Sequence, residues 1–446
     1  MIQELSEGQS RVLEAVWKGH NVFMTGSGGT GKSALVREIY RAFQKQRKRV
    51  QVVALTGCAA VLLGCKARTV HSFAGIGLGN GTIEENVDRV IKNYVKCRNW
   101  RQLEVLIVDE VSMMSRKLFE MLDAIARRTR RSDRPFGGLQ VIFSGDFFQI
   151  RPIGNEKEPD TMAFCFESPL WDVLFGKNQI QLDKIFRQND PIYARILNQI
   201  REGTIDDEAD KVIRQQIDKP RPEFPPTKLF PTRRQVEEVN RRELSLLPKE
   251  SEHVYTMKEE TDLPMTRAEL ETRARFGPNE IQNELLSLKK NLMCEPELRL
   301  RKGSHVMCIV NMELGEDVYL CNGSQGRIKD FTADGLPIVD FFADHLHDVI
   351  MECHVWESET IPGIGISQMP LILAWAITIH KAQGATLESA EIDVGASVFE
   401  CGQSYVALSR IKSLAGLYLT SFDPGSIYVN PAVRTFYDRL AQQQPV

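Results

Sequence analysis

The chain has 446 residues, more than one ordinary hydrophobic core organises, so roughly two to four domains are expected. Hydrophobic residues make up 42% and charged residues 26%, a composition typical of a folded globular protein that excludes general disorder. The net charge of -3, with a pI of about 6.3, does not by itself indicate nucleic-acid binding. Basic residues gathered along one groove would still suffice to bind phosphates.

Several classes of protein are disfavoured by patterns that the sequence lacks. No run of about 18 apolar residues occurs, so no transmembrane helix is expected. The first residues, MIQELSEGQSRVLEAV, carry acids in an amphipathic pattern and resemble neither a signal peptide nor a transit peptide. The 9 cysteines form no C-x-x-C pair, which disfavours a zinc site and favours free thiols in an intracellular protein.

The first part of the chain alternates apolar strand patterns with amphipathic helix patterns. Such alternation is typical of a parallel sheet covered by helices on both faces. The glycine-rich and polar stretch 75–100 interrupts it and is predicted to be a small insertion. The expected strands are 20–25, 50–56, 103–109 and 139–144, and the expected helices are 32–44 and 115–128.

A second α/β block is expected after a proline-rich linker at 220–226. It opens with a strand and a helix within 229–247, and 258–300 is polar and helical in pattern. Short β-rich segments between 301 and 360 predict a small inserted β-barrel, with strands at 305–310, 325–331, 336–342 and 350–356. The α/β character returns at 370–380 and 390–394. The predicted fold class is therefore α/β, with two parallel sheets and small insertions.

The strongest motif is Gly26-Ser-Gly-Gly-Thr-Gly31-Lys32-Ser33, which fits G-x-x-x-x-G-K-[ST] and stands between an expected strand and helix. Its glycines let backbone N–H groups face phosphate oxygens. Lys32 can reach the β- and γ-phosphates, and the Ser33 hydroxyl can ligate Mg²⁺. The motif predicts a site for a nucleoside triphosphate with Mg²⁺.

Two further strand ends carry polar groups suited to phosphate chemistry. The strand ending at Asp109 and Glu110 resembles a Walker B strand, in which Asp109 would hold Mg²⁺ and Glu110 would deprotonate water. A D-E pair alone is more often a solvated strand end, but here it follows a complete phosphate loop. The strand ending at Ser144 leads to Gln149, whose amide could sense a γ-phosphate. An ordinary strand-to-loop turn would explain that last pattern equally well.

These motifs predict an NTPase but not what it moves. The segments 379–386 and 405–410 suggest a second cassette that faces the nucleotide. An arginine from that block could complete the site and couple hydrolysis to the closing of two lobes. Arg410 and Arg187 are both candidates, and either could instead be a surface ion-pair partner.

The motif order resembles that of superfamily 1 helicases and is most similar to the Pif1 family. The segment TVHSFAGIG and the stretch from 116 through PFGG to the GDFFQ box are the most specific. The resemblance extends from residue 5 to about 425 and is weakest over 243–298. In chain order the matching segments are L-x-x-x-Q, GSGGTGKS, LTGCAA, TVHSFAGIG, IVDEVSMM, GDFFQI, IFRQ, AWAITIHKAQG and YVALSR.

The resemblance implies a domain organisation. Residues 1–181 would form a first RecA-like lobe with a small insertion at about 75–100. Residues 182–300 and 361–446 would form a second RecA-like lobe, and 301–360 would form an inserted SH3-like domain. From the residues alone, this β segment could equally be a binding module.

The resemblance also implies residue roles at ATP. Gln9 would recognise the adenine base, and Glu110 would act on the attacking water. The γ-phosphate would meet Gln149, Arg187 and Arg410, and the metal would bind Ser33 and Asp109. The full set assigned to the cofactor is Gln9, Gly26, Gly28, Gly29, Thr30, Gly31, Lys32, Ser33, Asp109, Gln383 and Gly384.

A channel for single-stranded DNA is implied as well. Hydroxyl and backbone N–H groups there would bind phosphates without recognising sequence. Phe73 could stack on a base, an interaction worth roughly 1–3 kcal/mol, but packing in the core is the alternative for this ring. The implied channel residues are Thr56, Gly57, His71, Ser72, Phe73, Thr378, His380 and Lys381.

The implied function is that of an ATP-dependent 5′→3′ DNA helicase. Such an enzyme would translocate on single-stranded DNA and unwind duplexes, DNA–RNA hybrids or G-quadruplexes during replication, repair, recombination and telomere maintenance. Its partners would be single strands and junctions with duplex DNA, without a membrane, and the protein would be a monomer in solution. In a eukaryote, the nucleus or the mitochondrion would be its compartment.

Three other functions stay open. The motifs allow an RNA helicase, because backbone contacts distinguish the sugars only where a 2′-OH is engaged. They also allow an ATPase that remodels protein–DNA complexes without unwinding. The third is a nucleotide-gated DNA-binding or scaffold protein with little catalysis. Five intact residues argue against it: Lys32, Asp109, Glu110, Arg187 and Arg410.

One local feature departs from the family pattern, and one cluster of basic residues is assigned no role by it. Arg151 stands where two prolines commonly follow GDFFQ in the family, so this turn is expected to be less rigid. A basic cluster could contact DNA or form a solvated helix end. It consists of Arg127, Arg128, Arg130, Arg131 and Arg134.

Overall fold

The computed structural model describes residues 5–63, 65–77, 79–188, 190–217, 219–220, 222, 225–315, 318–320, 322–342, 346–358, 360–382, 385–395 and 401–443. The chain divides into two compact units. Unit 1 comprises Met1–Asp206, Phe399–Ser409 and Gly425–Val446, and unit 2 comprises Asp207–Val398 and Arg410–Pro424. This division differs from the predicted domains, because residues 182–206 and the last helix belong to unit 1.

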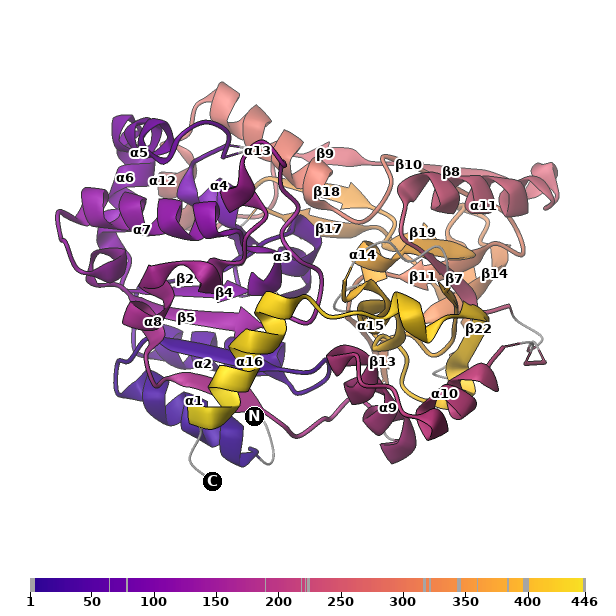
Figure 1. Cartoon of the computed structure of the whole chain (residues 1–446). Helices are drawn as coiled ribbons and strands as arrows, with labels where there is room; N and C mark the ends of the chain where they lie inside the picture. The colour runs from indigo at the N-terminus through magenta and orange to yellow at the C-terminus, as the bar shows by residue number, and fades with distance from the viewer. Residues whose placement is uncertain are drawn as a thin grey trace. The chain divides into compact units, whose positions relative to one another are not determined.

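A parallel sheet of 6 strands organises unit 1 (Figure 1). The adjacent strands run in the same direction throughout, which confirms the predicted parallel α/β character. All of the strands expected in this part of the sequence are present, and β3 and β6 are added at the two edges. The order is β3 (Arg68–Thr69), β2 (Val50–Ala54), β4 (Val105–Asp109), β5 (Gln140–Gly145), β1 (Val22–Gly26) and β6 (Gln179–Leu182).

Helices cover both faces of this sheet. One hydrophobic cluster contains residues of α1 (Glu7–Trp17), α2 (Lys32–Lys45) and α3 (Gly57–Leu63). The other contains residues of α4 (Val70–Ala74), α5 (Ile83–Lys92), α6 (Tyr94–Gln102), α7 (Arg116–Arg130), α8 (Pro169–Phe175) and α16 (Pro431–Gln443). The helices α9 (Pro191–Glu202) and α15 (Gln403–Leu408) complete unit 1.

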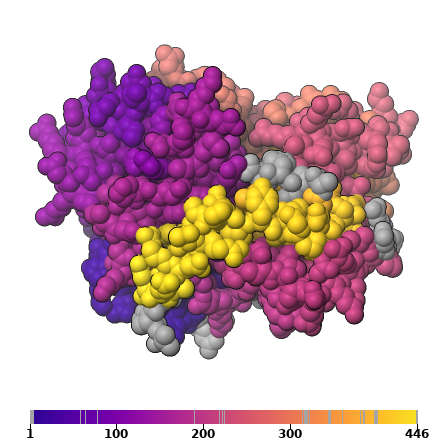
Figure 2. All heavy atoms as spheres, viewed as in Figure 1, coloured from indigo at the N-terminus to yellow at the C-terminus, as the bar shows by residue number. Residues whose placement is uncertain are grey.

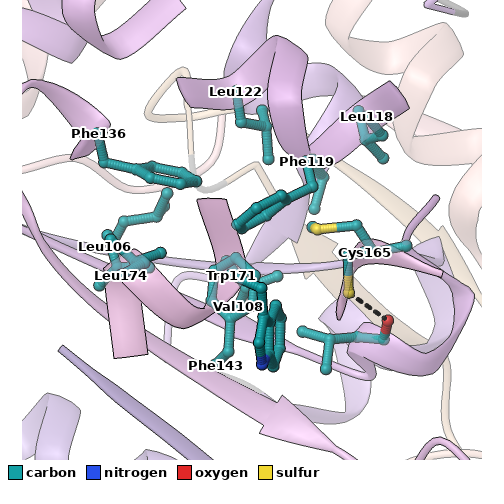
Figure 3. Close-up of a cluster of buried hydrophobic side chains, with 14 of the residues drawn as sticks. Leu106, Val108, Leu118, Phe119, Leu122, Phe136, Phe143, Cys165, Trp171 and Leu174 are labelled. Carbon is teal, nitrogen blue, oxygen red and sulfur yellow. Dashed lines mark hydrogen bonds between the residues drawn. The ribbon is translucent and has the colours of Figure 1, made fainter. Parts of the chain in front are cut away.

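Alternate residues of each strand enter the two clusters, as the period of a β-strand requires. In β4, Leu106 and Val108 belong to the cluster drawn in Figure 3, whereas Val105 and Ile107 belong to the other. In Figure 3 the rings around Trp171 pack between β4, β5 and α7. This packing fixes the strand ends from which the polar loops begin.

The C-terminal helix α16 is part of the unit 1 core. Its Val433, Phe436 and Leu440 are buried in the same cluster as Trp171. Figure 2 shows its yellow atoms lying along the surface of unit 1. The predicted second lobe therefore does not contain this helix.

Unit 2 contains a second parallel sheet, of 4 strands, as predicted. Its order is β20 (Ala376–Thr378), β7 (Thr227–Phe230), β21 (Ala390–Val394) and β22 (Leu417–Phe422). The helices of this unit are α10 (Asp207–Arg214), α11 (Arg233–Ser245), α12 (Arg267–Arg273), α13 (Pro278–Asn291) and α14 (Ile379–Ala382).

Antiparallel strands make up the rest of unit 2. A sheet of 5 strands has the order β16 (Val349–Ile350), β15 (Pro337–Phe341), β14 (Gln325–Phe331), β11 (His305–Cys308) and β19 (Leu371–Leu373). Smaller sheets join β12 (Met312–Gly315) to β13 (Val318–Leu320), β8 (His253–Thr256) to β10 (Glu297–Leu300), and β17 (His354–Glu357) to β18 (Gly365–Gln368) and β9 (Lys258–Glu260).

These sheets correct two expectations from the sequence. The expected strand 350–356 is divided between two sheets, and the stretch 258–300, expected to be helical, begins and ends in strands. The SH3-like shape of the inserted domain stays a prediction. Within the described part of the chain, every helix is too short or too polar to cross a bilayer.

Candidate nucleotide-binding site

The glycine loop between β1 and α2 has a backbone that only glycine adopts easily. Gly29 and Gly31 have φ values of 89° and 84°, in the left-handed region. A Cβ atom on Gly29 would lie 2.6 Å from the Cβ atom of Arg187, and one on Gly26 would lie 2.5 Å from the carbonyl of Leu182. The motif glycines therefore allow a tight loop of the kind that presents N–H groups to an anion.

Lys32 lies inside this loop. Its ammonium group donates hydrogen bonds to the carbonyls of Gly26, at 2.7 Å, and Ser27, at 3.0 Å. Burial lowers the pKa of Lys32, while the carboxylates of Asp146, Glu110 and Asp109 act in the opposite direction. A cation held inside the glycine loop is suited to receive phosphate groups.

Two oxygen donors meet where the metal is predicted. The Ser33 hydroxyl donates to Oδ2 of Asp109 at 3.3 Å, and Asp109 is only 3% exposed. A hydroxyl and a carboxylate are hard oxygen ligands of the kind that Mg²⁺ takes together with phosphate oxygens and water. The side chains present therefore fit the metal that the motif predicts.

Glu110 begins a short helical turn in a strained conformation. Its φ of 58° and ψ of 42° place a non-glycine residue in the left-handed region. Such conformations cost roughly 1–3 kcal/mol and gather at functional sites. The turn directs the chain away from β4 directly after the metal-binding position, a feature that the sequence did not predict.

Gln149 has a side-chain oxygen that suits a ligand. It is 5% exposed, and its Oε1 atom has no hydrogen-bond partner among the described residues. Leaving a buried acceptor without a partner costs roughly 1–3 kcal/mol. A water molecule or another donor at the γ-phosphate position would satisfy it.

Gln9 contacts the glycine loop from α1. Its Oε1 atom accepts from the Ser6 backbone at 3.0 Å in a capping box, and its Nε2 atom donates to the Thr30 carbonyl at 3.3 Å. Beside it, Phe186 is 43% exposed, and its backbone N–H donates to the Gly29 carbonyl at 2.8 Å. An exposed ring at this place could stack on a base, and no pattern in the IFRQ motif had indicated this role.

Arg187 lies in unit 1, beside the glycine loop. Its Nη1 atom donates to the carbonyl of Ser409 at 3.1 Å. Burial lowers its pKa, opposed by Tyr405 and Glu110. The prediction that Arg187 comes from the second lobe is therefore corrected: this arginine reaches the loop from its own unit.

The other predicted nucleotide residues are distributed differently. Arg410 belongs to unit 2, where its carbonyl accepts from the Leu387 N–H at 2.9 Å. Gln383 and Gly384 lie outside the described residues. A residue that the sequence analysis did not assign, Tyr405, has its hydroxyl 2.6 Å from the N–H of Gly28, which donates to it.

The predicted DNA residues of unit 1 lie at two short helices. The Thr56 hydroxyl accepts from the Ala59 N–H at the start of α3, where Gly57 is the first residue. His71 lines a cavity of about 380 Å³, and burial lowers its pKa. The Ser72 carbonyl accepts from Lys96 at 2.7 Å.

Phe73 does not present a stacking face. Its ring is 3% exposed, and its centroid lies 4.8 Å from that of Trp100 in the hydrophobic core. The alternative of core packing therefore explains this residue, and we remove it from the set of DNA-binding candidates.

The remaining DNA candidates belong to unit 2. The Thr378 hydroxyl accepts from the Lys381 N–H at 3.1 Å, and the Lys381 ammonium donates to the Met293 carbonyl at 3.2 Å. His380 lies in α14 between them, with a side chain outside the described set. The predicted channel residues are thus divided between the two units.

The basic cluster at the end of α7 has two kinds of member. Arg127 pairs with Asp123 at 2.7 Å, and Arg130 donates to several backbone carbonyls, including that of Leu103 at 2.7 Å. Arg128 and Arg131 are exposed. The cluster is therefore partly structural, and its binding role stays open.

A parallel sheet whose first strand leads through a glycine loop into a helix, with acids at the end of a nearby strand, defines a P-loop NTPase. The family model of the PIF1-like helicase matches residues 4–211. The crystal structure of Pif1 helicase from Candida albicans matches this fold with a TM-score of 0.75. The two sequences are 34% identical, and the match covers 99% of this chain and 100% of that one. The chain belongs to the Pif1-like helicase family, and its units have the RecA-like α/β fold of that family.

Two further relatives are informative. The ATP-dependent DNA helicase PIF1 of Emericella nidulans is 34% identical over 97% of this chain, which spans 62% of that protein's length. The Pif1 helicase from Bacteroides in complex with ADP-AlF3 and ssDNA is 25% identical, with a TM-score of 0.64, over 99% of this chain and 98% of that one.

Proposed function

We propose that this protein is an ATP-dependent helicase that moves 5′→3′ along single-stranded DNA and separates duplex strands. The observation that carries the proposal is the buried acceptor of Gln149 in the same unit as the glycine loop, Lys32 and the Ser33–Asp109 pair. The names of relatives, an ATP-dependent DNA helicase and a Pif1 with ADP-AlF3 and ssDNA, support the choice of ATP and DNA.

The residues divide the ATP chemistry among them. In the proposal, the loop N–H groups and Lys32 hold the phosphates, and Ser33 and Asp109 hold Mg²⁺, which would neutralise phosphate charge when bound. Glu110 deprotonates the attacking water, and Gln149 and Arg187 contact the γ-phosphate. Arg410 supplies a second arginine from unit 2.

The residues proposed to bind DNA are found in both units. Thr56, Gly57, His71 and Ser72 belong to unit 1, whereas Thr378, His380 and Lys381 belong to unit 2. Translocation requires contacts with DNA whose strength changes with the nucleotide state. Junctions of single and double strands, and G-quadruplexes, are the proposed substrates of a monomeric motor.

The test uses matched duplexes with a 5′ or a 3′ single-stranded tail, with ATP hydrolysis followed in the same tubes. Unwinding of the 5′-tailed duplex alone, with hydrolysis stimulated by single strands, is expected. Stimulated hydrolysis without unwinding would favour a remodelling ATPase. The absence of stimulation by DNA, with stimulation by RNA, would favour an RNA helicase.

Replacing Phe186 by Ala tests the proposed base-binding face. Loss of ring stacking, worth roughly 0.5–1.5 kcal/mol, should raise the KM for ATP by about 2- to 12-fold and leave kcat nearly unchanged. Steady-state hydrolysis checks this result. Phe73→Leu, in the core, is the control that should leave this KM unchanged, and an unaltered KM in Phe186→Ala would refute the role of the ring.

A further inference from the structure

A buried ion pair lies close enough to Lys32 of the phosphate site for its charges to affect the pKa of that lysine. The pair has no role in the chemistry proposed above. Asp146, the residue after β5, is completely buried, and Arg201 of α9 is 5% exposed. The guanidinium binds the carboxylate through two hydrogen bonds, of 2.9 and 2.8 Å, and lies 4.2 Å from the ring centroid of Phe148. Removing one partner of such a pair leaves an uncompensated buried charge.

Tyr437 of α16 joins this pair to the start of the glycine loop. Its hydroxyl donates to Oδ1 of Asp146 at 3.2 Å and accepts from the N–H of Phe147 at 3.2 Å. It also lies 2.5 Å from the hydroxyl of Thr25. Because a phenol has one proton, and Asp146 receives it, the Thr25 hydroxyl is the donor in this last bond. Asp146, Arg201, Tyr437 and Thr25 are called the Asp146 cluster below.

The Asp146 cluster holds the beginnings of two functional loops together. Thr25 precedes Gly26, the first residue of the glycine loop, and pairs in register with Gly145 of the neighbouring strand. The carbonyl of Asp146 accepts from the Gln149 N–H at 2.9 Å. A shift in this cluster would therefore move the γ-phosphate-sensing amide relative to the phosphate loop.

The cluster also sets the charge near Lys32. The carboxylate of Asp146 attracts the Lys32 ammonium, and Arg201 opposes that attraction. Without Arg201, a fully negative Asp146 would compete with the incoming phosphates for Lys32 and repel their charge. Neutralisation by Arg201 leaves Lys32 available to the nucleotide.

The two helices that complete the cluster are also connecting segments. The chain first enters unit 2 at Asp207, shortly after α9, and returns from it for the last time at Gly425, shortly before α16. It also passes through unit 1 between these points, at Phe399–Ser409. Arg434 of α16 donates to the carbonyl of Glu202, the last residue of α9, at 2.9 Å. The first and the last of the four connections therefore begin and end beside helices that contribute to the Asp146 cluster within unit 1.

We propose that Arg201 and Tyr437 are positioning residues for ATP hydrolysis, which hold Asp146 and the Gln149 loop in register with the glycine loop. Tyr437 acts on turnover rather than on nucleotide affinity, because it touches neither the phosphates nor the base. Arg201 also balances the charge of Asp146 near Lys32, so its loss affects nucleotide affinity as well. This inference rests on the proposed ATPase function and adds residues outside every motif assigned above.

Tyr437→Phe is the sharpest test, because it keeps the buried ring and removes only the hydroxyl. We expect kcat per nucleotide site to fall about tenfold, because misplaced catalytic groups lose rate steeply, while the KM for ATP changes less than about threefold. The concentration of nucleotide sites is measured by titration with a fluorescent ATP analogue. The kcat is then calculated per site, so that unfolded protein does not lower it. Tyr255→Phe in unit 2, which loses a 2.6 Å bond to the Gly335 carbonyl, is the matched control with unchanged kcat.

A second measurement does not depend on hydrolysis. Amide hydrogen exchange over 144–150, without nucleotide, should be faster in Tyr437→Phe than in the wild type and in Tyr255→Phe. Arg201→Met should lower kcat further, and Arg201→Lys should restore part of it. Turnover and exchange equal to those of Tyr255→Phe would overturn the inference. If the wild type hydrolyses no ATP, the proposed function fails. The positioning role is overturned separately if hydrogen exchange in Tyr437→Phe is the same as in the wild type.

Discussion

Replacing Glu110 by Gln is expected to lower ATP turnover about a thousandfold, because removal of a general base typically costs 10²- to 10⁴-fold. Nucleotide binding should persist, since the amide is nearly isosteric and Lys32, Ser33 and Asp109 remain in place. The left-handed backbone of Glu110 holds its side chain at the end of β4, and the substitution does not alter that backbone. Stopped-flow hydrolysis and equilibrium binding of a fluorescent ATP analogue measure the two effects.

The matched control for this experiment is Glu104→Gln. Glu104 lies just before β4, and its side chain is 45% exposed. Its carboxylate forms a surface ion pair with the guanidinium of Arg49 at 3.3 Å. Exposed ion pairs contribute little to the stability of a protein. ATP turnover and nucleotide binding should therefore both be unchanged in Glu104→Gln. A Glu110→Gln variant that turns over ATP at the control's rate would remove Glu110 from the catalytic set and favour a scaffold function.

Acidification is expected to destabilise unit 2 through His305. This residue of β11 is 5% exposed, and neither ring nitrogen has a hydrogen-bond partner among the described residues. Burial disfavours the charged ring and lowers the pKa of His305 to about 4, from an ordinary value of 6.5. The unfolded chain therefore binds a proton between these two values, while the folded chain does not.

The sign of the effect follows from this difference. Stability is full above pH 6.5 and decreases as the pH falls towards 4, by about 3 kcal/mol in total. Urea unfolding of unit 2, monitored through the hydrogen exchange of backbone amides in 305–341, should show this loss of stability between pH 7 and pH 4.5. In His305→Leu this part of the pH dependence should disappear.

His347→Gln serves as the control for the histidine experiment. His347 lies in the same unit with a side chain that is 67% exposed, so its replacement should leave the pH dependence of unfolding unchanged. A His305→Leu variant with the wild-type pH dependence would show that another group, not the buried imidazole, controls the acid sensitivity.

Local patterns were sufficient for the elements that carry the phosphate chemistry. The glycine loop, the strand ending in Asp109 and the strand before Gln149 each combine an apolar run with a polar end, and both signals lie within a few residues. The same patterns predicted the parallel α/β fold. Periodicity failed where segments were short and polar, as at 258–260 and 297–300, which form strands by pairing with distant segments.

Single residues were harder to assign than elements. The ring of Phe73 could serve a base or the core equally well, and only the position of Trp100 decided for the core. Arg187 was expected from the other lobe, because its distance in sequence from the glycine loop gives no information about which sheet its segment joins. Phe186 carried no motif signal beyond its place in IFRQ, although its exposure beside Gln9 makes it a candidate.

The sequence by itself determined the P-loop class, the parallel sheets and the family. Glycine geometry and strand period are local properties, and the order of the motifs can be followed directly along the chain. Only the tertiary structure decided that the C-terminal helix belongs to unit 1 and that Tyr437 and Arg201 both contact Asp146. Tyr437 is 291 positions from Asp146. A contact over that distance in sequence arises from how the helices pack on the sheet. The sequence around Tyr437 and the sequence around Asp146 contain no local pattern that predicts the contact.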